Sequence, residues 1–115
     1  EGEVSYMVLG GKFTHAILKK AKEGDYRVQA VHGGTIEKYE PTDEEIDFAE
    51  EVISKCREDI VYARVDVLRD NENKLSLCEL EVFEPELWFR THPSAVEVFA
   101  DAVVKYIEDV IPRTP

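Results

Sequence analysis

The sequence predicts an α+β domain in which an antiparallel β-sheet is covered on one face by two α-helices. Three observations predict this class. The β-rich runs come in hairpins, two amphipathic segments follow residues that begin helices, and the spacing lacks the strand–helix–strand rhythm of a parallel sheet. A chain of 115 residues suits a single domain.

The amino-terminal part predicts a hairpin. The runs VSYMVL (4–9) and KFTHAIL (12–18) are rich in β-branched and aromatic residues. The glycine pair at 10–11 between them tolerates the positive φ angles of a tight turn. A further run, YRVQAV (26–31), predicts a third strand that stops at HGG (32–34).

Two helices follow from capping signals and helical periodicity. Thr42 with Glu45 forms a capping box for a helix over 43–57. Its predicted apolar face is Ile46, Ala49, Val52, Ile53 and Cys56. Ser94 with Glu97 predicts the start of the second helix. The residues expected to face the core are Val96, Phe99, Val103, Tyr106, Ile107 and Val110. We expect a domain over 1–111 and a tail over 112–115.

Between the helices, YARVDVLRD (62–70) and LSLCELEVF (75–83) predict a second hairpin. A register that pairs Asp70 with Leu75 places Asp66 opposite Glu79 and Arg64 opposite Glu81 on one face. The other face is then apolar, and its expected pairs are Ala63 with Val82, Val65 with Leu80 and Val67 with Cys78. The helices must therefore cover the apolar face.

The charged face of this hairpin is a candidate metal site. Two carboxylates directly opposite each other, with Cβ atoms about 5 Å apart, repel one another. Arg64 can pair with Glu81, which leaves Asp66 and Glu79 in need of a cation or a shared proton. Ligands that offer only oxygen suit Mg²⁺ or Mn²⁺. The alternative is that this face is simply solvated.

Composition narrows the function classes. Lys and Arg number 14 against 25 Asp and Glu, the net charge is −11, and no basic patch is interleaved with aromatic residues. We therefore expect neither nucleic-acid nor membrane binding. Cys56 and Cys78 lack a CxxC partner, which predicts two buried free thiols in a reducing, cytoplasmic location. The sequence lacks an initiating Met and strand-like residues begin within about three positions of its start, so we expect a piece of a longer protein.

Three segments in order resemble the carboxy-terminal half of an ATP-grasp ligase. They are GEVSYMVLGGKFTHAILKKAKEGDYRVQAVHGG (2–34), the first helix, and YARVDVLRDNENKLSLCELEVFEP (62–85). The order is similar to that of the glutathione-synthetase-like and ribosomal-protein glutamate ligases, where a GxFRxNxxxGG-like turn and a D…ExN hairpin flank a helix. The resemblance covers nearly the whole chain.

This resemblance implies a carboxylate–amine ligase. In the family, a carboxylate attacks the γ-phosphate of ATP and an amine captures the acylphosphate to give an amide. ATP and Mg²⁺ or Mn²⁺ would be the cofactors, and a small-molecule carboxylate and amine the substrates. The resemblance also implies amino-terminal lobes of the same protein, upstream of these residues, so that this part alone has little or no activity.

The resemblance also assigns residue roles. Asp66 and Glu79 would be metal ligands, and Glu81 stands where the family usually has Asn, which adds a negative charge to the second-metal position. The four further residues would contact the nucleotide or substrate. Arg64 would steady the transferring phosphoryl group, Arg27 would meet the acylphosphate or the substrate carboxylate, Glu3 would accept from the ribose hydroxyls, and Lys19 would reach phosphate or substrate.

Two other functions fit the same residues. A non-catalytic acidic module of the same shape would bind a partner through its charged sheet face, and Glu81 in place of Asn favours it. A two-metal phosphoesterase would use the same carboxylates, but such sites usually draw on His ligands and no His neighbours these residues in the sequence.

Overall fold

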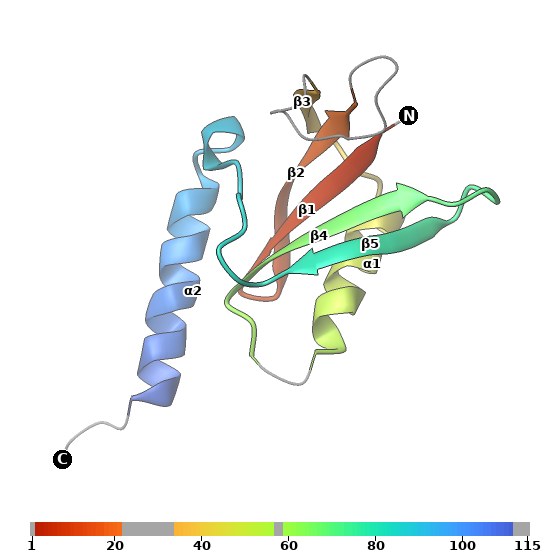
Figure 1. The fold of residues 1–115 in the computed structure, drawn as a ribbon. Coiled ribbons are helices and arrows are strands. Elements are labelled where there is room, and N and C mark those ends of the chain that lie inside the picture. Colours follow the sequence, from red (N-terminus) through yellow and green to blue (C-terminus); the bar gives the residue numbers. More distant parts are fainter. Residues whose placement is uncertain (1, 22–33, 57–58, 112–115) are drawn as a thin grey trace.

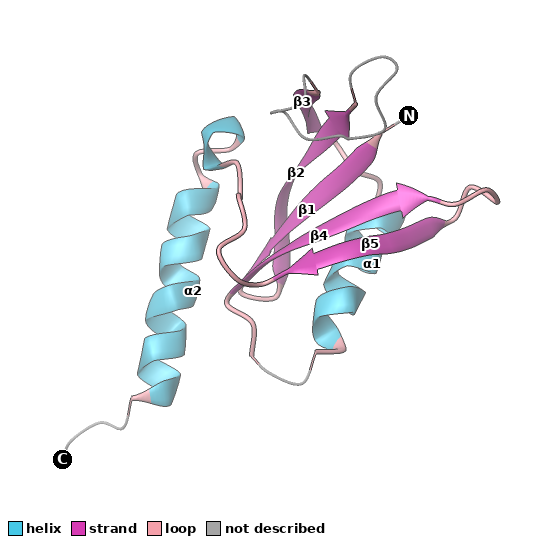
Figure 2. Cartoon of the chain, in the orientation of Figure 1, coloured by secondary structure: helices cyan, strands magenta, loops and turns pink. Residues whose placement is uncertain are grey.

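The computed structural model describes residues 2–21, 34–56 and 59–111. Its centre is a five-stranded antiparallel sheet in the order β3-β2-β1-β4-β5 (Figures 1 and 2). The strands are β1 (Glu3–Leu9), β2 (Lys12–Lys20), β3 (Thr35–Tyr39), β4 (Tyr62–Arg69) and β5 (Leu75–Glu81). The helices are α1 (Asp43–Ser54), the short η2 (Phe89–Thr91) and α2 (Ala95–Val110). The predicted α+β class is confirmed.

The two long helices lie on opposite faces of the sheet, so the expectation that both cover one face is wrong. Tyr6 and Val8 of β1 pack in one core with Ala49 of α1. Met7, the residue between them, packs in a second core with Ala95 of α2. Because successive side chains of a strand point to opposite faces, a continuous apolar run such as VSYMVL requires cover on both sides.

The second core also holds Leu9, Ile17, Leu87 and Trp88. The segment between β5 and η2 supplies the last two of these residues, so it covers the face opposite α1 together with the start of α2. Figure 1 shows this segment running from β5 across to the amino-terminal end of α2. The charged residues of β4 lie on this same face.

Helix α2 contacts the sheet mainly through its first turns. Ala95 is buried, and Phe99 packs against the second core. Four of the residues predicted to face the core are instead 42% to 56% exposed, namely Val96, Tyr106, Ile107 and Val110. The prediction is wrong at Val96, because Ala95 is the residue of the first turn that faces the core. Toward the carboxyl end the turns extend beyond the sheet (Figure 1), so Tyr106, Ile107 and Val110 have no sheet to pack against within the described residues.

One of the two predicted capping boxes is present. The Thr42 side chain accepts from the backbone N–H of Glu45, and the Glu45 carboxylate accepts from the backbone N–H of Thr42. Glu45 is buried and also accepts from the hydroxyls of Tyr6 and Tyr39, which joins α1 to β1 and β3. Ser94 makes no capping hydrogen bond, and its backbone is already helical, so the second predicted box is wrong.

The second hairpin has the predicted register near the charged residues and a different one toward the turn. Arg64 pairs with Glu81 and Asp66 with Glu79, as predicted. A β-bulge then leaves Cys78 without a partner, so Val67 pairs with Leu77 instead. Arg69, not Asp70, pairs with Leu75, because Asp70 belongs to the turn: its side chain accepts from the backbone N–H groups of residues 72 and 74.

Three further expectations can be compared with the structure. Strand β3, an edge strand, was not predicted, because TIEKY combines two charged residues with only a short apolar pattern. The predicted strand over 26–31 lies outside the described residues. The prediction of two buried thiols is wrong, since Cys56 is half-buried and Cys78 is exposed. In the described part of the chain, no helix is long and apolar enough to cross a membrane.

Candidate functional site

A row of charged side chains crosses four strands on the face opposite α1. Strand registers align it: Glu3 pairs with Lys19 across β1 and β2, and Ser5 pairs with Asp66 across β1 and β4. Asp66 in turn pairs with Glu79 of β5. Residues directly paired across antiparallel strands point to the same face. Adjacent strands therefore bring together groups that are 61 positions apart in sequence, such as Ser5 and Asp66.

Asp66 lies at the centre of this row and is 1% exposed. Its Oδ1 accepts from Ser5 Oγ at 2.5 Å and from Arg64 Nε at 3.0 Å. Its Oδ2 accepts from Arg64 Nη2 at 2.9 Å, and Lys19 Nζ lies 3.7 Å away. A carboxylate this deeply buried requires opposite charge and hydrogen bonds. Here two cations and one hydroxyl supply them.

Arg64 bridges two acids. Besides its two bonds to Asp66, its Nη2 lies 3.2 Å from Glu81 Oε2, and its Nη1 donates to the backbone carbonyl of Glu86 at 3.4 Å. Burial lowers the pKa of Arg64, but the hydrogen bond and charge of Asp66 and the charge of Glu81 outweigh it and raise that pKa. The predicted Arg64–Glu81 pair is confirmed, whereas the expectation that Asp66 lacks an opposite charge is wrong.

Glu3 on β1 and Lys19 on β2 extend the row as far as β2. The Lys19 ammonium forms an ion pair with the Glu3 carboxylate, and both side chains are almost fully buried. The order Glu3, Lys19, Asp66, Arg64, Glu81 is therefore one of alternating negative and positive charges. Each cation lies between two acids, so every member of the row has opposite charge beside it.

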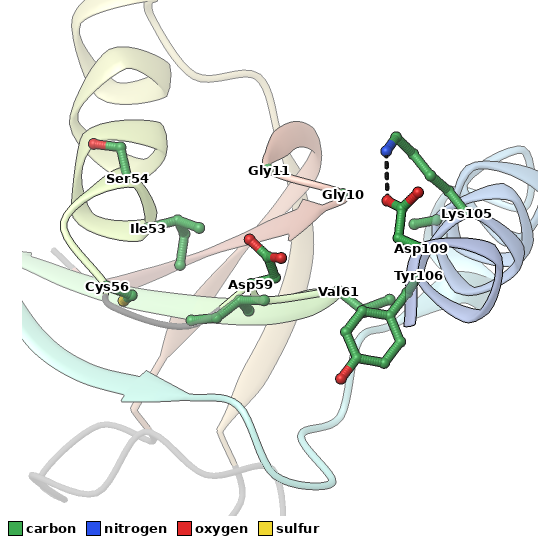
Figure 3. A pocket seen from close by; sticks show the side chains of 12 residues that line it. Gly10, Gly11, Ile53, Ser54, Cys56, Asp59, Val61, Lys105, Tyr106 and Asp109 are labelled. Carbon is green, nitrogen blue, oxygen red and sulfur yellow. Dashed lines mark hydrogen bonds and ion pairs between the residues drawn. The ribbon is translucent and has the colours of Figure 1, made fainter. Parts of the chain in front are cut away.

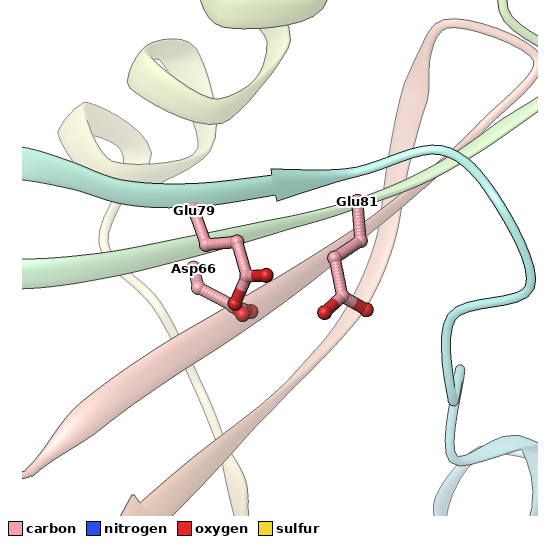
Figure 4. Close-up of side chains that lie close together, drawn as sticks. All are labelled: Asp66, Glu79 and Glu81. Carbon is pink, nitrogen blue, oxygen red and sulfur yellow. The ribbon is translucent and has the colours of Figure 1, made fainter.

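Asp66, Glu79 and Glu81, here called the acidic cluster, each offer one carboxylate oxygen within 4.8 Å of the others (Figure 4). Glu79 is the exposed member. Desolvation, then a hydrogen bond with Glu81 and the charges of Glu81 and Asp66, raise the pKa of Glu79, while Arg64 lowers it. The excess negative charge of this face therefore lies on the β5 side of the cluster. Three carboxylates with no nitrogen or sulfur ligand fit Mg²⁺ or Mn²⁺.

The β-bulge lies directly beside this cluster and was not predicted. It interrupts the pairing between Asp66 and Val67, where β5 inserts Cys78. Bulges often lie next to functional sites, where they re-aim a side chain. Desolvation and the neighbouring carboxylates, Glu3 first, raise the pKa of the Cys78 thiol. Cys78 therefore stays a neutral thiol beside the acids at neutral pH.

Trp88, in the segment after β5, lies beside this site. It is 6% exposed and packs in the second core. Its ring centroid also lies 5.1 Å from Arg64 Cζ and 5.8 Å from Lys19 Nζ. Its backbone is left-handed, with φ 48° and ψ 45°, which costs a residue other than glycine about 1–3 kcal/mol. An aromatic residue just after the acidic strand was the only available sequence signal.

Six predicted site residues lie on this face: Glu3, Lys19, Arg64, Asp66, Glu79 and Glu81. Arg27 lies outside the described residues. A separate groove of about 360 Å³ lies at the turn of the β1–β2 hairpin, between α1 and α2 (Figure 3). The ion pair in this groove joins Lys105 to Asp109 at 2.8 Å and is exposed on one helix. None of the residues that line the groove belongs to the charged row, so the groove is a separate feature.

Solved structures with a similar fold include three enzymes. The D-cycloserine synthetase DcsG matches with a TM-score of 0.75 at 19% identity, over 91% of this chain and 38% of its own. The ATP-grasp ligase PsnB, solved with a phosphomimetic variant of a minimal precursor, Mg and ADP, matches with a TM-score of 0.60 at 18% identity, over 89% of this chain and 34% of its own. D-alanine–D-alanine ligase from Bacillus anthracis, complexed with ATP, matches with a TM-score of 0.58 at 16% identity, over 90% of this chain and 37% of its own.

These matches show that the chain shares the fold of part of each of these enzymes. At the level of sequence, the family described as RimK-like ATP-grasp domain matches residues 1–88. The chain therefore belongs to the RimK-like ATP-grasp family. It spans between 34% and 38% of the length of the three solved enzymes named above. A search of curated proteins finds no match.

Proposed function

We propose that this chain is the metal- and nucleotide-binding half of an ATP-dependent ligase that joins a carboxylate to an amine. The observation that carries the proposal is the acidic cluster: three carboxylates meet within 4.8 Å on the same face as two buried basic side chains, Arg64 and Lys19. Membership of the RimK-like ATP-grasp family supports the ligase class. A PsnB structure that contains Mg and ADP is consistent with the same cofactors.

In this proposal Asp66, Glu79 and Glu81 hold Mg²⁺ or Mn²⁺ through carboxylate oxygens. The bound ion would supply charge neutralisation for the phosphates of ATP. Arg64 adds a fixed positive charge beside the cluster and would contact the transferring phosphoryl group. Lys19, already placed between Glu3 and Asp66, would reach a phosphate or the substrate, and Glu3 would accept from the ribose hydroxyls.

The reaction would proceed in two transfers. A substrate carboxylate oxygen attacks the γ-phosphorus of ATP, the bond to the β,γ-bridging oxygen breaks, and ADP leaves. The amine nitrogen then attacks the acyl carbon, phosphate leaves, and the amine gives up a proton as the amide forms. No side chain of the protein becomes covalently bonded, so the residues of the site act by binding, orientation and charge. Arg27 would meet the acylphosphate or the substrate carboxylate.

A Mn²⁺ titration followed by NMR tests the metal part of the proposal. We expect paramagnetic broadening to centre on Asp66 and Glu79, and Asp66→Asn to remove it. Glu72→Gln is a matched control because it also removes one acid, yet Glu72 is exposed in the turn and pairs with Lys74. Uniform or absent broadening would contradict the metal site.

A longer parent protein allows the catalytic part to be tested. Glu79→Gln should abolish ATP-dependent amide formation in that parent while leaving its fold intact. Asp66→Asn should also abolish it, in a folded but less stable protein, because Arg64 and Lys19 lose the acid between them. Turnover that survives either change at ordinary Mg²⁺ concentrations would rule out the proposed mechanism. For residues 1–115 alone we expect little or no ligase activity.

A second candidate is a non-catalytic acidic module of the same fold that binds a partner through this face. The observation that favours it is the state of Asp66, whose oxygens already accept from Arg64 and Ser5 with Lys19 nearby. Such a module would bind Mn²⁺ weakly or not at all. The same titration therefore distinguishes the two candidates.

A further inference from the structure

The indole ring of Trp88 contacts the two cations of the site. Arg64 Cζ lies 5.1 Å and Lys19 Nζ 5.8 Å from its centroid, both within the roughly 6 Å over which a cation is attracted to the face of an aromatic ring. Tryptophan is the strongest of the three aromatic residues in this interaction. Trp88 is therefore placed to act on the charged row and not only on the apolar core.

The two cations also repel each other, and the Trp88 ring lies within cation–π distance of both. Arg64 Nη2 and Lys19 Nζ both approach the same atom, Asp66 Oδ2, at 2.9 Å and 3.7 Å. The negative face of an aromatic ring attracts both charges without adding a further ionised group. An aliphatic side chain of similar size would fill the same space but would leave the two cations to repel each other.

The backbone holds Trp88 in this position. Its N–H donates to Glu86 Oε2 at 3.3 Å, and its carbonyl accepts from the Thr91 N–H at 3.0 Å and from Thr91 Oγ1 at 2.8 Å. These bonds fix a left-handed conformation that a residue other than glycine rarely adopts. Burial of this segment alone does not require the left-handed conformation of Trp88, because its neighbours Leu87 and Phe89 already pack in the same core.

We propose that Trp88 is a positioning residue, which holds the Arg64 guanidinium and the Lys19 ammonium against Asp66 by cation–π contact. This role of Trp88 rests on the proposed function only where it predicts an effect on metal binding. By keeping Arg64 on Asp66, Trp88 makes the site ordered before a ligand enters and makes a divalent ion compete with a fixed guanidinium. A purely structural role would leave Arg64 and Lys19 unaffected by the aromatic character of residue 88.

Side-chain NMR tests the contact itself. With Trp88 present, ring currents should shift the Arg64 Hδ and Lys19 Hε resonances upfield, and the Arg64 Hε should exchange slowly with water. Trp88→Leu should abolish the shifts and speed the exchange, and Trp88→Phe should keep part of both. Phe99→Leu is the matched control, since it removes an aromatic ring from the same core without touching either cation. Equal Arg64 and Lys19 shifts in the unaltered protein and in Trp88→Leu would overturn the proposal.

A double-mutant cycle tests whether Trp88 acts through Arg64. Loosening Arg64 from Asp66 by Trp88→Leu should raise the Mn²⁺ affinity about 2- to 10-fold, the equivalent of one cation–π contact. In an Arg64→Met background the same change should have a smaller effect on Mn²⁺ affinity, because Trp88 then holds only Lys19 near Asp66. An equal effect in both backgrounds would show that Trp88 does not act through Arg64. If the unaltered chain binds no Mn²⁺, the proposed metal site fails, while the NMR shifts still decide the role of Trp88.

Discussion

Arg64→Met should raise the affinity of the acidic cluster for Mn²⁺. This is the opposite of what is expected for a residue that merely supports a binding site. Both Asp66 oxygens accept from Arg64, at 3.0 Å and 2.9 Å, so the guanidinium occupies positions that a metal ion would need. Methionine has a similar unbranched reach and is apolar, so it fills the space without offering a competing charge.

The size of the effect follows from the bonds that an ion must replace. Each hydrogen bond between charged groups contributes about 1.5–3 kcal/mol. An ion that takes one Asp66 oxygen displaces at least one such bond. The removal of this competition therefore corresponds to about a 10- to 100-fold gain in Mn²⁺ affinity. The same change should lower the free energy of unfolding in the absence of metal by about 3 kcal/mol, since Asp66 then keeps only Ser5 and Lys19.

Mn²⁺ affinity can be measured by isothermal titration calorimetry, with circular dichroism to confirm that the variant is folded at the working temperature. Arg69→Met is the matched control, because Arg69 lies on the same strand and carries the same charge. It is exposed and donates to the backbone of residue 73 in the turn. We expect Arg69→Met to change Mn²⁺ affinity much less. An Arg64→Met variant that is folded and binds Mn²⁺ no better than the unaltered chain would refute the competition between Arg64 and metal.

Three further predictions concern charge and pH. The pKa of Glu79 is raised in the folded protein, so ionisation of Glu79 opposes folding at pH values above its ordinary pKa. Glu79→Gln should therefore raise the free energy of unfolding by a few tenths of a kcal/mol at pH 7 and leave it unchanged at pH 3. Urea titrations at both pH values measure this difference. Burial lowers the pKa of His15, whose Nε2 bonds the Leu87 carbonyl, so stability should fall as the pH drops below about 6.5, and His15→Gln should reduce this loss in thermal melts between pH 7.5 and 5. Because Trp88 is the single tryptophan and contacts Arg64, Mg²⁺ should change its fluorescence emission, and Asp66→Asn should abolish that change.

Strand alternation made the positions of the charged residues of the second hairpin predictable. Successive side chains of a strand point to opposite faces, so Arg64 and Asp66 were expected on the same face once the hairpin was recognised. Their partners Glu81 and Glu79 followed from the register. The predicted cross-strand pairs toward the turn were wrong by one residue, because the register there depends on the geometry of the turn. Asp70 accepts from two backbone N–H groups inside the turn, and a bulge at Cys78 compensates for the altered count.

The opposite placement of α1 and α2 was also readable in principle. VSYMVL has no polar alternation apart from Ser5, and a strand of that kind is buried on both faces. The hairpin of β4 and β5 has one apolar and one charged face, which suggested cover on one side only. The position of the second helix depends on the central strand β1, whose side chains need cover on both faces, and not on the hairpin of β4 and β5.

The charge pairing around Asp66 could not be predicted from the hairpin, because its partners come from elsewhere in the chain. Lys19 arrives from β2, Ser5 from β1, and Trp88 from the segment after β5. Considered alone, the hairpin contains three acids and one arginine on its charged face, so it indicates an excess of negative charge that requires a cation or a shared proton. The structure locates that excess more narrowly. Asp66 is neutralised by Arg64 and Lys19, and the unneutralised charge lies on β5, where the pKa of Glu79 is raised. A divalent ion would therefore first meet Glu79 and Glu81, and would gain Asp66 only as Arg64 releases it, so metal affinity and the position of Arg64 must change together.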